Sequence, residues 1–129
     1  MSAPPRFTTT LLVPTYEWPE ALELVLLSVL RQRPVPDEVL VCDDGSSPPT
    51  GALVRDLAPR LERAGATVVY LRQERDDQRA AAVRNLGLAR ARGDYVLQVD
   101  GDCVLAPDFV AAHRAFARPG SFVQGSRVM

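Results

Sequence analysis

The chain has 129 residues, which suits one domain, and with 47% hydrophobic and 24% charged residues it can bury a core. The net charge of -1 at pH 7 gives no electrostatic basis for binding nucleic acid or acidic lipid. All 15 lysine-plus-arginine positions are arginine, so a Walker A phosphate loop and a pyridoxal enzyme, which both depend on a lysine, are excluded.

Strand patterns and helix patterns alternate along the chain. Each predicted strand is a short apolar run, and each predicted helix repeats its apolar residues every three or four positions. Pro14 is expected to stop the first strand, and Gly65 and Gly93 to end two of the helices. The predicted elements are strand 8–13, helix 19–31, strand 38–42, helix 48–64, strand 66–71, helix 79–92, strand 95–99, helix 107–117 and strand 121–128.

This order predicts an α/β, Rossmann-like fold with a mainly parallel sheet flanked by helices on both faces. In open sheets of this kind, ligands bind beyond the carboxyl ends of the strands. Polar segments follow each of the first four predicted strands, so we expect them to converge on one edge of the sheet. They are Pro14-Thr15-Tyr16-Glu17, Asp43-Asp44-Gly45-Ser46, residues 72–79 and Asp100-Gly101-Asp102.

Asp100-Gly101-Asp102 is the clearest chemical signal among these segments. Two carboxylates separated by a glycine at a strand end can face one cation while the backbone turns closely past it. Their hard oxygen atoms suit Mg²⁺ or Mn²⁺. Short acidic turns are also common without a metal, and the position after an apolar strand favours the metal site.

Asp43 and Asp44 form a second acidic pair. One carboxylate could accept a hydrogen bond from a uracil-type base while the other organises the loop, but a turn or a helix cap explains the pair equally well. Arg79, at the start of its predicted helix, is the best placed of six nearby arginines to face a diphosphate. Tyr16 either flanks a base or is an ordinary exposed aromatic residue.

Cys42 and Cys103 form neither a CxxC pair nor a zinc-binding spacing, so we expect two buried, reduced thiols. Reduced thiols favour a cytoplasmic location, and the inner face of a membrane is compatible with it. No segment is long and apolar enough to span a membrane. His113 is expected on a helix surface rather than in catalysis.

Four segments, in the same order, resemble the N-terminal half of family 2 glycosyltransferases with the GT-A fold. They read LLVPTY at 11–16, VLVCDDGSS at 39–47, AAAVRNLGLA at 80–89 and GDYVLQVDGD at 93–102. The resemblance implies transfer of a sugar, usually with inversion, from a nucleoside-diphosphate sugar such as a UDP-sugar. It also implies Mg²⁺ or Mn²⁺ as cofactor and a glycan or lipid-linked acceptor. The tail is similar to bacterial enzymes of surface-polysaccharide or lipopolysaccharide synthesis.

The family's nucleotide-sugar site can be carried over by position. Asp44 would bond the uracil ring, Asp102 would ligate the metal, and Asp100 would contact the ribose, a metal-bound water or the metal itself. The implied nucleotide-sugar-binding residues are Pro14, Thr15, Tyr16, Glu17, Asp43, Asp44, Arg79, Asp100, Gly101 and Asp102.

Several positions depart from the family pattern. Glu17 stands where asparagine is frequent, and Cys103 stands where a third acid often follows. Gln78 and Arg79 stand where glycines are frequent. These departures concern the identity of the donor and the coordination of the metal more than the fold.

The residue that would deprotonate the acceptor is not identified in this sequence. In the family, the general base is a carboxylate in the acceptor-binding half, and no residue up to Met129 matches its motif. We therefore expect the base beyond Met129. We also expect residues 1–129 to be a single donor-binding domain, truncated before that half, which transfers sugar poorly by itself. Uncovered apolar surface would then favour self-association.

Two other functions are alternatives to a glycosyltransferase. A sugar nucleotidyltransferase has a related fold, but it needs a glycine-rich loop with a basic residue where this chain has residues 14–19. A non-catalytic nucleotide-sugar-binding module would keep the same fold. The presence of both acids in the metal motif favours donor chemistry.

Overall fold

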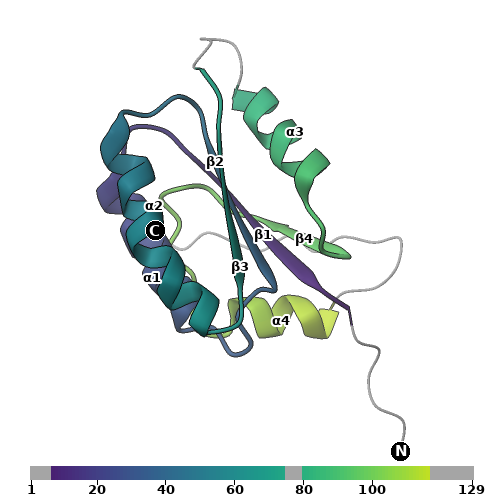
Figure 1. Cartoon of the computed structure of the whole chain (residues 1–129). Coiled ribbons are helices and arrows are strands. Elements are labelled where there is room, and N and C mark those ends of the chain that lie inside the picture. The colour runs from purple at the N-terminus through teal and green to yellow at the C-terminus, as the bar shows by residue number, and fades with distance from the viewer. Residues whose placement is uncertain (1–6, 75–79, 117–129) are drawn as a thin grey trace, which may run out of the picture.

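The computed structural model describes residues 7–74 and 80–116. Its four strands run parallel in one sheet, in the order β3-β2-β1-β4 (Figure 1). The strands are β1 (Thr9–Thr15), β2 (Glu38–Asp43), β3 (Thr67–Arg72) and β4 (Tyr95–Gln98). The helices are α1 (Pro19–Leu30), α2 (Pro48–Arg63), α3 (Ala80–Arg90) and α4 (Phe109–Phe116). The predicted α/β class and parallel sheet are confirmed.

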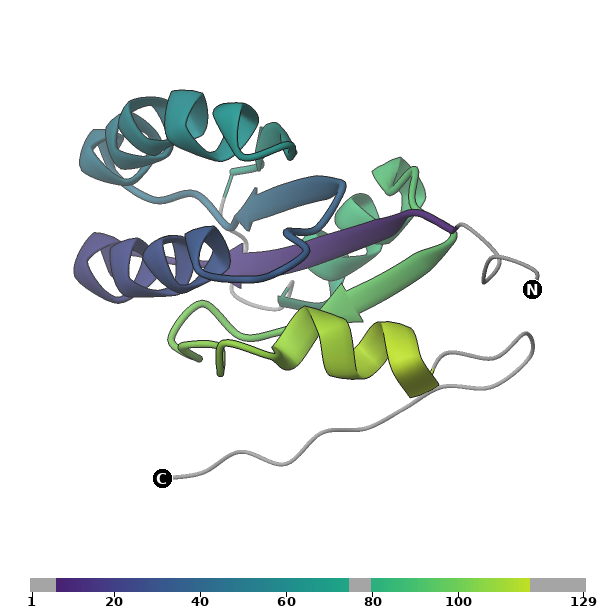
Figure 2. The ribbon, with the colours of Figure 1, turned by 90° about the horizontal axis from the view of Figure 1, so that it is seen from below.

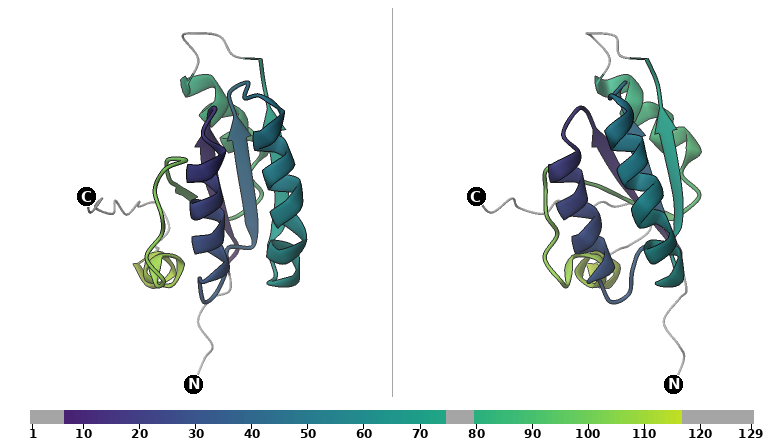
Figure 3. Two further views of the ribbon diagram at one scale, coloured as in Figure 1. Left: turned by 90° about the vertical axis from the view of Figure 1, so that its left-hand side faces the viewer. Right: turned by 60° about the vertical axis from the view of Figure 1, so that its left-hand side comes forward.

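Helices cover both faces of the sheet, because successive side chains of a strand point to opposite faces. Leu11 and Val13 of β1 belong to the larger apolar cluster, which also contains residues of α1 and α2. Leu12, between them, belongs to a second cluster with Val83 of α3. Figure 3 shows α1 and α2 in front of the strands and α3 behind them. The alternation along β1 therefore separates two cores.

The chain reverses direction across the sheet at β1. It moves outward through β2 and β3, then returns to pair β4 with the other side of β1. Such a reversal leaves a crevice at the carboxyl ends of the two strands that flank it, which is where ligands bind in open α/β sheets. Here those strands are β1 and β4.

Strand β1 continues through Pro14, whereas the sequence predicts that it stops there. The carbonyl oxygen of Thr15 accepts from a residue that follows β2, so by alternation the nitrogen of Pro14 faces β4. The pairing with β4 already ends at Leu12 and Gln98. The missing N–H of proline therefore removes no hydrogen bond from the sheet.

Helix α4 packs beside β4 (Figure 2). The helix begins at Phe109, two residues later than predicted, because residues 107 and 108 form a turn. His113 is half-buried rather than on the helix surface: its Nδ1 lies 3.1 Å from the hydroxyl of Tyr95, and its ring centroid lies 4.7 Å from that of Phe109. Burial lowers the pKa of His113. These contacts give it a packing role.

Three of the sequence predictions fall outside the described residues. They concern Arg79, the strand expected at 121–128, and the chain end at Met129, beyond which the general base is expected. No helix in the described part of the chain is long and apolar enough to cross a membrane.

Candidate functional site

The carboxyl end of β1 is the meeting point of the predicted site segments. The backbone N–H of Asp44 donates to the carbonyl oxygen of Thr15 at 3.1 Å, which attaches the loop after β2. Gly101, after β4, packs so tightly on the same end that a Cβ there would lie 2.4 Å from the carbonyl oxygen of Pro14. The expected convergence on one edge is therefore present for the segments after β1, β2 and β4.

Asp43 organises the loop after β2. Its side chain is fully buried. Its Oδ1 accepts from the backbone N–H of Ser46 at 3.0 Å and from the Ser46 hydroxyl at 2.5 Å. Its Oδ2 accepts a hydrogen bond from the hydroxyl of Tyr70 on β3, and burial together with this bond raises the pKa of Tyr70. Asp43 thus bonds the loop through Oδ1 and strand β3 through Oδ2.

Asp44 is held differently from its neighbour. It is 8% exposed, and its Oδ1 accepts from the side-chain amide of Gln73 at 3.1 Å. Gln73 follows β3, and its own backbone N–H donates to the carbonyl oxygen of Asp43 at 3.0 Å. Gln73 lies in the polar segment 72–79 that was expected to converge on this edge, although neither it nor Tyr70 was singled out from the sequence.

Glu17 connects the loop after β1 to the start of α2. Its backbone N–H donates to the Ser46 hydroxyl at 2.8 Å, and its carboxylate accepts from the Ser47 hydroxyl at 2.8 Å and from the Ser47 N–H. A carboxylate is favourable at a helix N-terminus, where backbone N–H groups lack partners. Glu17 has a φ of 49°, in the left-handed region that asparagine adopts more readily than glutamate. The left-handed conformation explains why asparagine is frequent at this position in the family that the sequence resembles.

Replacement of Glu17 with glutamine should weaken the dependence of stability on acid pH. Hydrogen bonds from the backbone and then the side chain of Ser47 lower the pKa of Glu17 below its ordinary value of 4.5. A carboxyl group with a lowered folded-state pKa stabilises the fold above its unfolded-state pKa, and this contribution disappears as the pH falls through the folded-state value. The free energy of unfolding in urea should be measured from neutral pH down through 4.5. On the acid side of this profile, it should fall less steeply for Glu17→Gln than for the wild type.

The matched control for this experiment is Glu62→Gln, an exposed residue near the other end of α2. It should leave the acid side of the profile close to that of the wild type. An unchanged profile in Glu17→Gln would contradict the assignment of Glu17 to the start of α2.

The segment after β4 folds into a tight turn. The backbone N–H of Cys103 donates to the carbonyl oxygen of Asp100 at 3.1 Å. Nη2 of Arg84, on α3, lies 3.1 Å from Oδ1 of Asp100 in a half-exposed ion pair. One ligand atom each from Asp100, Asp102 and Cys103 lies within 4.8 Å of the others. Two carboxylates and a thiol at this spacing suit one divalent cation.

The two cysteines differ in exposure. Cys42 is fully buried in the apolar cluster under α3, and burial raises its pKa to about 11. Cys103 is partly exposed, so the expectation of two buried thiols is confirmed for Cys42 and wrong for Cys103. Both thiols are free, as predicted.

A small hollow of about 130 Å³ lies between the end of β1 and the turn after β4. Two exposed aromatic side chains border it, Tyr16 at 44% and Trp18 at 55% exposure. Trp18 was not singled out from the sequence, although its position two residues after Tyr16 could have indicated it. The lining residues are Pro14, Thr15, Tyr16, Trp18, Gly101 and Asp102.

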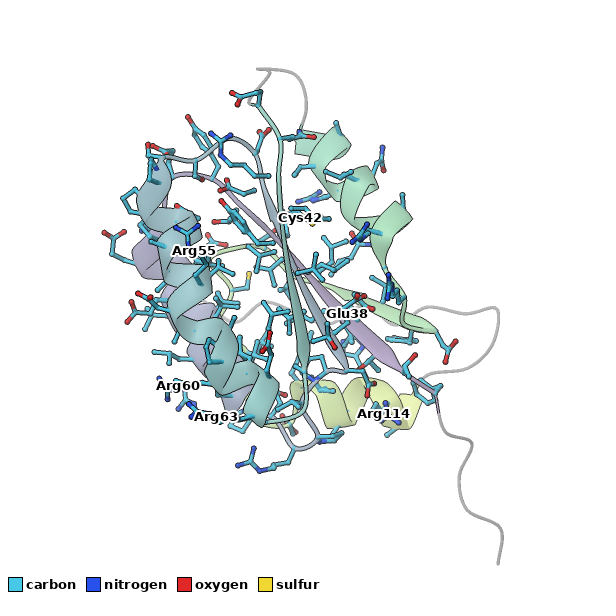
Figure 4. All side chains as sticks on the ribbon, viewed as in Figure 1. Glu38, Cys42, Arg55, Arg60, Arg63 and Arg114 are labelled. Carbon is cyan, nitrogen blue, oxygen red and sulfur yellow. The ribbon has the colours of Figure 1, made fainter. Side chains whose placement is uncertain are left out.

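A larger hollow of about 340 Å³ lies at the opposite, amino end of the strands. The two acidic side chains that line it accept hydrogen bonds from the backbone. Asp37 accepts from the N–H of Thr9 at 2.8 Å, and Glu38 accepts from the N–H of Arg92 at 2.9 Å. Figure 4 shows Glu38 and Cys42 towards opposite ends of β2. This hollow contains none of the predicted site segments, and the smaller one is therefore the better candidate.

The family model for "Glycosyl transferase family 2" matches residues 10–129. The chain belongs to glycosyltransferase family 2. It is 34% identical over 100 residues to chondroitin synthase of Escherichia coli, in an alignment that covers 77% of this chain and 14% of that protein. The family match confirms the family that the sequence motifs predicted. It also disfavours the alternative of a sugar nucleotidyltransferase.

Solved structures agree with this membership. The mannosyltransferase PcManGT from Pyrobaculum calidifontis, in complex with GDP-Man and Mn²⁺, superposes with a TM-score of 0.76 at 28% identity, over 88% of this chain and 33% of that one. S. aureus TarS 1-349, in complex with UDP-GlcNAc, gives a TM-score of 0.72 at 27% identity, over 84% of this chain and 30% of that one. The family 2 chain thus spans a third or less of the length of each of these three proteins.

Proposed function

We propose that this family 2 chain binds the nucleoside-diphosphate sugar of an inverting, metal-dependent glycosyltransferase. The observation that carries the proposal is the packing of Gly101 on Pro14. This contact brings the acidic turn after β4 beside the loops after β1 and β2, which resemble the family's nucleotide-binding motifs. The solved relatives named above are complexes with nucleotide sugars, which supports the same ligand class here.

In the proposed complex, Asp102 and Asp100 would hold Mg²⁺ or Mn²⁺ near the diphosphate. The hard oxygen atoms of two carboxylates fit such an ion, and the exposed position of Asp102 leaves room for ligand oxygens. When bound, the ion would stabilise the charge that develops on the departing nucleoside diphosphate. Arg84, already beside Asp100, and Arg79 are proposed to add positive charge on the diphosphate side.

The nucleotide is proposed to be UDP. Asp44 would accept the N3–H of uracil, with its carboxylate oriented by Gln73. Tyr16 and Thr15 would border the base and ribose, while Asp43 and Glu17 shape the loops around them.

The general base is proposed to lie beyond Met129, in the acceptor-binding half of the enzyme. Among the described residues, the acids of the candidate site already have roles in the loops or at the proposed metal, and we assign none of them to this step. The 129 residues by themselves should therefore bind the donor and transfer sugar poorly. Clear metal-dependent transfer to a glycan acceptor by these residues alone would contradict this division of roles.

We propose a glycan or lipid-linked acceptor, a cytoplasmic location that is compatible with the inner face of a membrane, and self-association of the 129-residue chain. Light scattering that gives one monodisperse monomer at high concentration would contradict the last point. Turnover or donor hydrolysis would separate a transferase from a non-catalytic nucleotide-sugar-binding module.

Calorimetric titration of UDP with and without Mn²⁺ tests the donor site directly. Binding should require the metal, and Asp102→Asn should weaken it by about tenfold or more, since a neutral amide is a poorer ligand for a hard cation. Asp108→Asn is the matched control, because Asp108 is also exposed and lies just before α4. UDP binding that ignores both Mn²⁺ and Asp102→Asn would contradict the proposal.

A further inference from the structure

The thiol of Cys103 lies at the proposed metal site rather than in a core. Its Sγ is 3.8 Å from Oδ1 of Asp102, and ligand atoms of Asp100, Asp102 and Cys103 all lie within 4.8 Å of one another. The side chain is partly exposed, so a cation from solvent can reach the sulfur.

Backbone geometry, and not only side-chain orientation, brings the three residues together. The hydrogen bond from the N–H of Cys103 to the carbonyl oxygen of Asp100 closes the turn at 3.1 Å. The close contact of Gly101 with Pro14 presses this turn onto the end of β1. The placement of the thiol next to the two acids is therefore built into the packing of the sheet.

We propose that Cys103 is a third protein ligand of the divalent metal, beside Asp102 and Asp100. The inference rests on the proposed function of the same site. A metal–sulfur bond would form as the thiol releases its proton to solvent, since the thiolate is the form that binds metals. Sulfur is a softer ligand than oxygen, so the site should favour transition-metal ions such as Co²⁺ or Zn²⁺ over Mg²⁺.

Cys42 provides an internal comparison. It is fully buried, and its sulfur faces α3 so closely that a Cβ at Gly87 would lie 2.5 Å from it. A cation cannot reach this thiol in the folded chain, and Cys42→Ala should therefore leave metal binding unchanged. Cys103→Asp supplies the opposite comparison, because it replaces sulfur by a hard oxygen ligand at the same position of the turn.

Titration with Co²⁺, under a reductant that contains no thiol, tests the proposal on the full chain. A thiolate bound to Co²⁺ gives an intense near-ultraviolet charge-transfer band, which carboxylate ligands do not give. We expect this band in the wild type and in Cys42→Ala, and its loss in both Cys103→Ser and Cys103→Asp. Circular dichroism of each variant checks that it is folded.

Competition with Mg²⁺ supplies a second readout. Loss of even an outer-shell partner costs about 10–100-fold in metal affinity, so exchange of a ligand should shift the preference for Co²⁺ over Mg²⁺ by about tenfold or more. The shift should favour Mg²⁺ in Cys103→Asp, which still binds metal.

The outcomes separate this inference from the proposed function. Calorimetric binding of Co²⁺ that depends on Asp102 but gives no charge-transfer band would overturn the role of Cys103 and leave the metal site intact. Persistence of the band in Cys103→Ser would overturn it as well. Absence of any metal binding would overturn both proposals.

Discussion

Gly101→Ala is expected to abolish metal-dependent UDP binding and to destabilise the fold. The new Cβ would lie 2.4 Å from the carbonyl oxygen of Pro14 and 3.3 Å from the Cα of Thr15. Both are backbone atoms of the central strand, so no flexible side chain can move aside. The turn that carries Asp102 must shift instead. Overpacking of this kind costs about 1–3 kcal/mol.

Urea unfolding and calorimetric titration of UDP with Mn²⁺ should be measured together on this variant. Asp102→Asn is the matched control: it should weaken UDP binding and keep the unfolding midpoint of the wild type, because its side chain is exposed. Gly101→Ala should lose UDP binding and should also have a lower unfolding midpoint. Wild-type affinity in a folded Gly101→Ala variant would mean that the contact with Pro14 does not position the metal motif.

Asp43→Ala is expected to produce the largest loss of stability among the loop residues. The substitution removes the acceptor for the Ser46 N–H, the Ser46 hydroxyl and the Tyr70 hydroxyl. Ser46 is only 2% exposed, so water cannot readily replace the lost bonds. Each buried donor without a partner costs about 1–3 kcal/mol. We expect a total loss of about 2–5 kcal/mol, measured by urea unfolding.

Two milder changes at the same place are the controls for this prediction. Tyr70→Phe removes one donor and leaves both bonds to Ser46, so it should cost less than Asp43→Ala. Asp43→Asn keeps an acceptor oxygen and should lie between the wild type and Asp43→Ala. A loss in Asp43→Ala no larger than that in Tyr70→Phe would contradict the role of Asp43 as the centre of the loop.

The sequence by itself determined the order of elements and the place of the candidate site. Leu11, Leu12 and Val13 are apolar in succession, and this run predicted a strand covered on both faces, as the two apolar clusters show. The acidic residues stand directly after strands, and the ends of parallel strands meet at one edge. Both inferences depend on local patterns: the periodicity of side chains and the conformational preferences of short segments.

The tertiary structure alone decided which atoms meet at that edge. The continuation of β1 through Pro14 depends on where β4 stops pairing, and the need for glycine at 101 depends on the carbonyl oxygen of Pro14. Tyr70 reaches Asp43, and Glu17 reaches Ser47, across about 30 residues of chain. Such contacts depend on the register and packing of strands that are distant in sequence. A local pattern carries no information about either, and for that reason the exposure of Cys103 beside the acids could be found only in the folded chain.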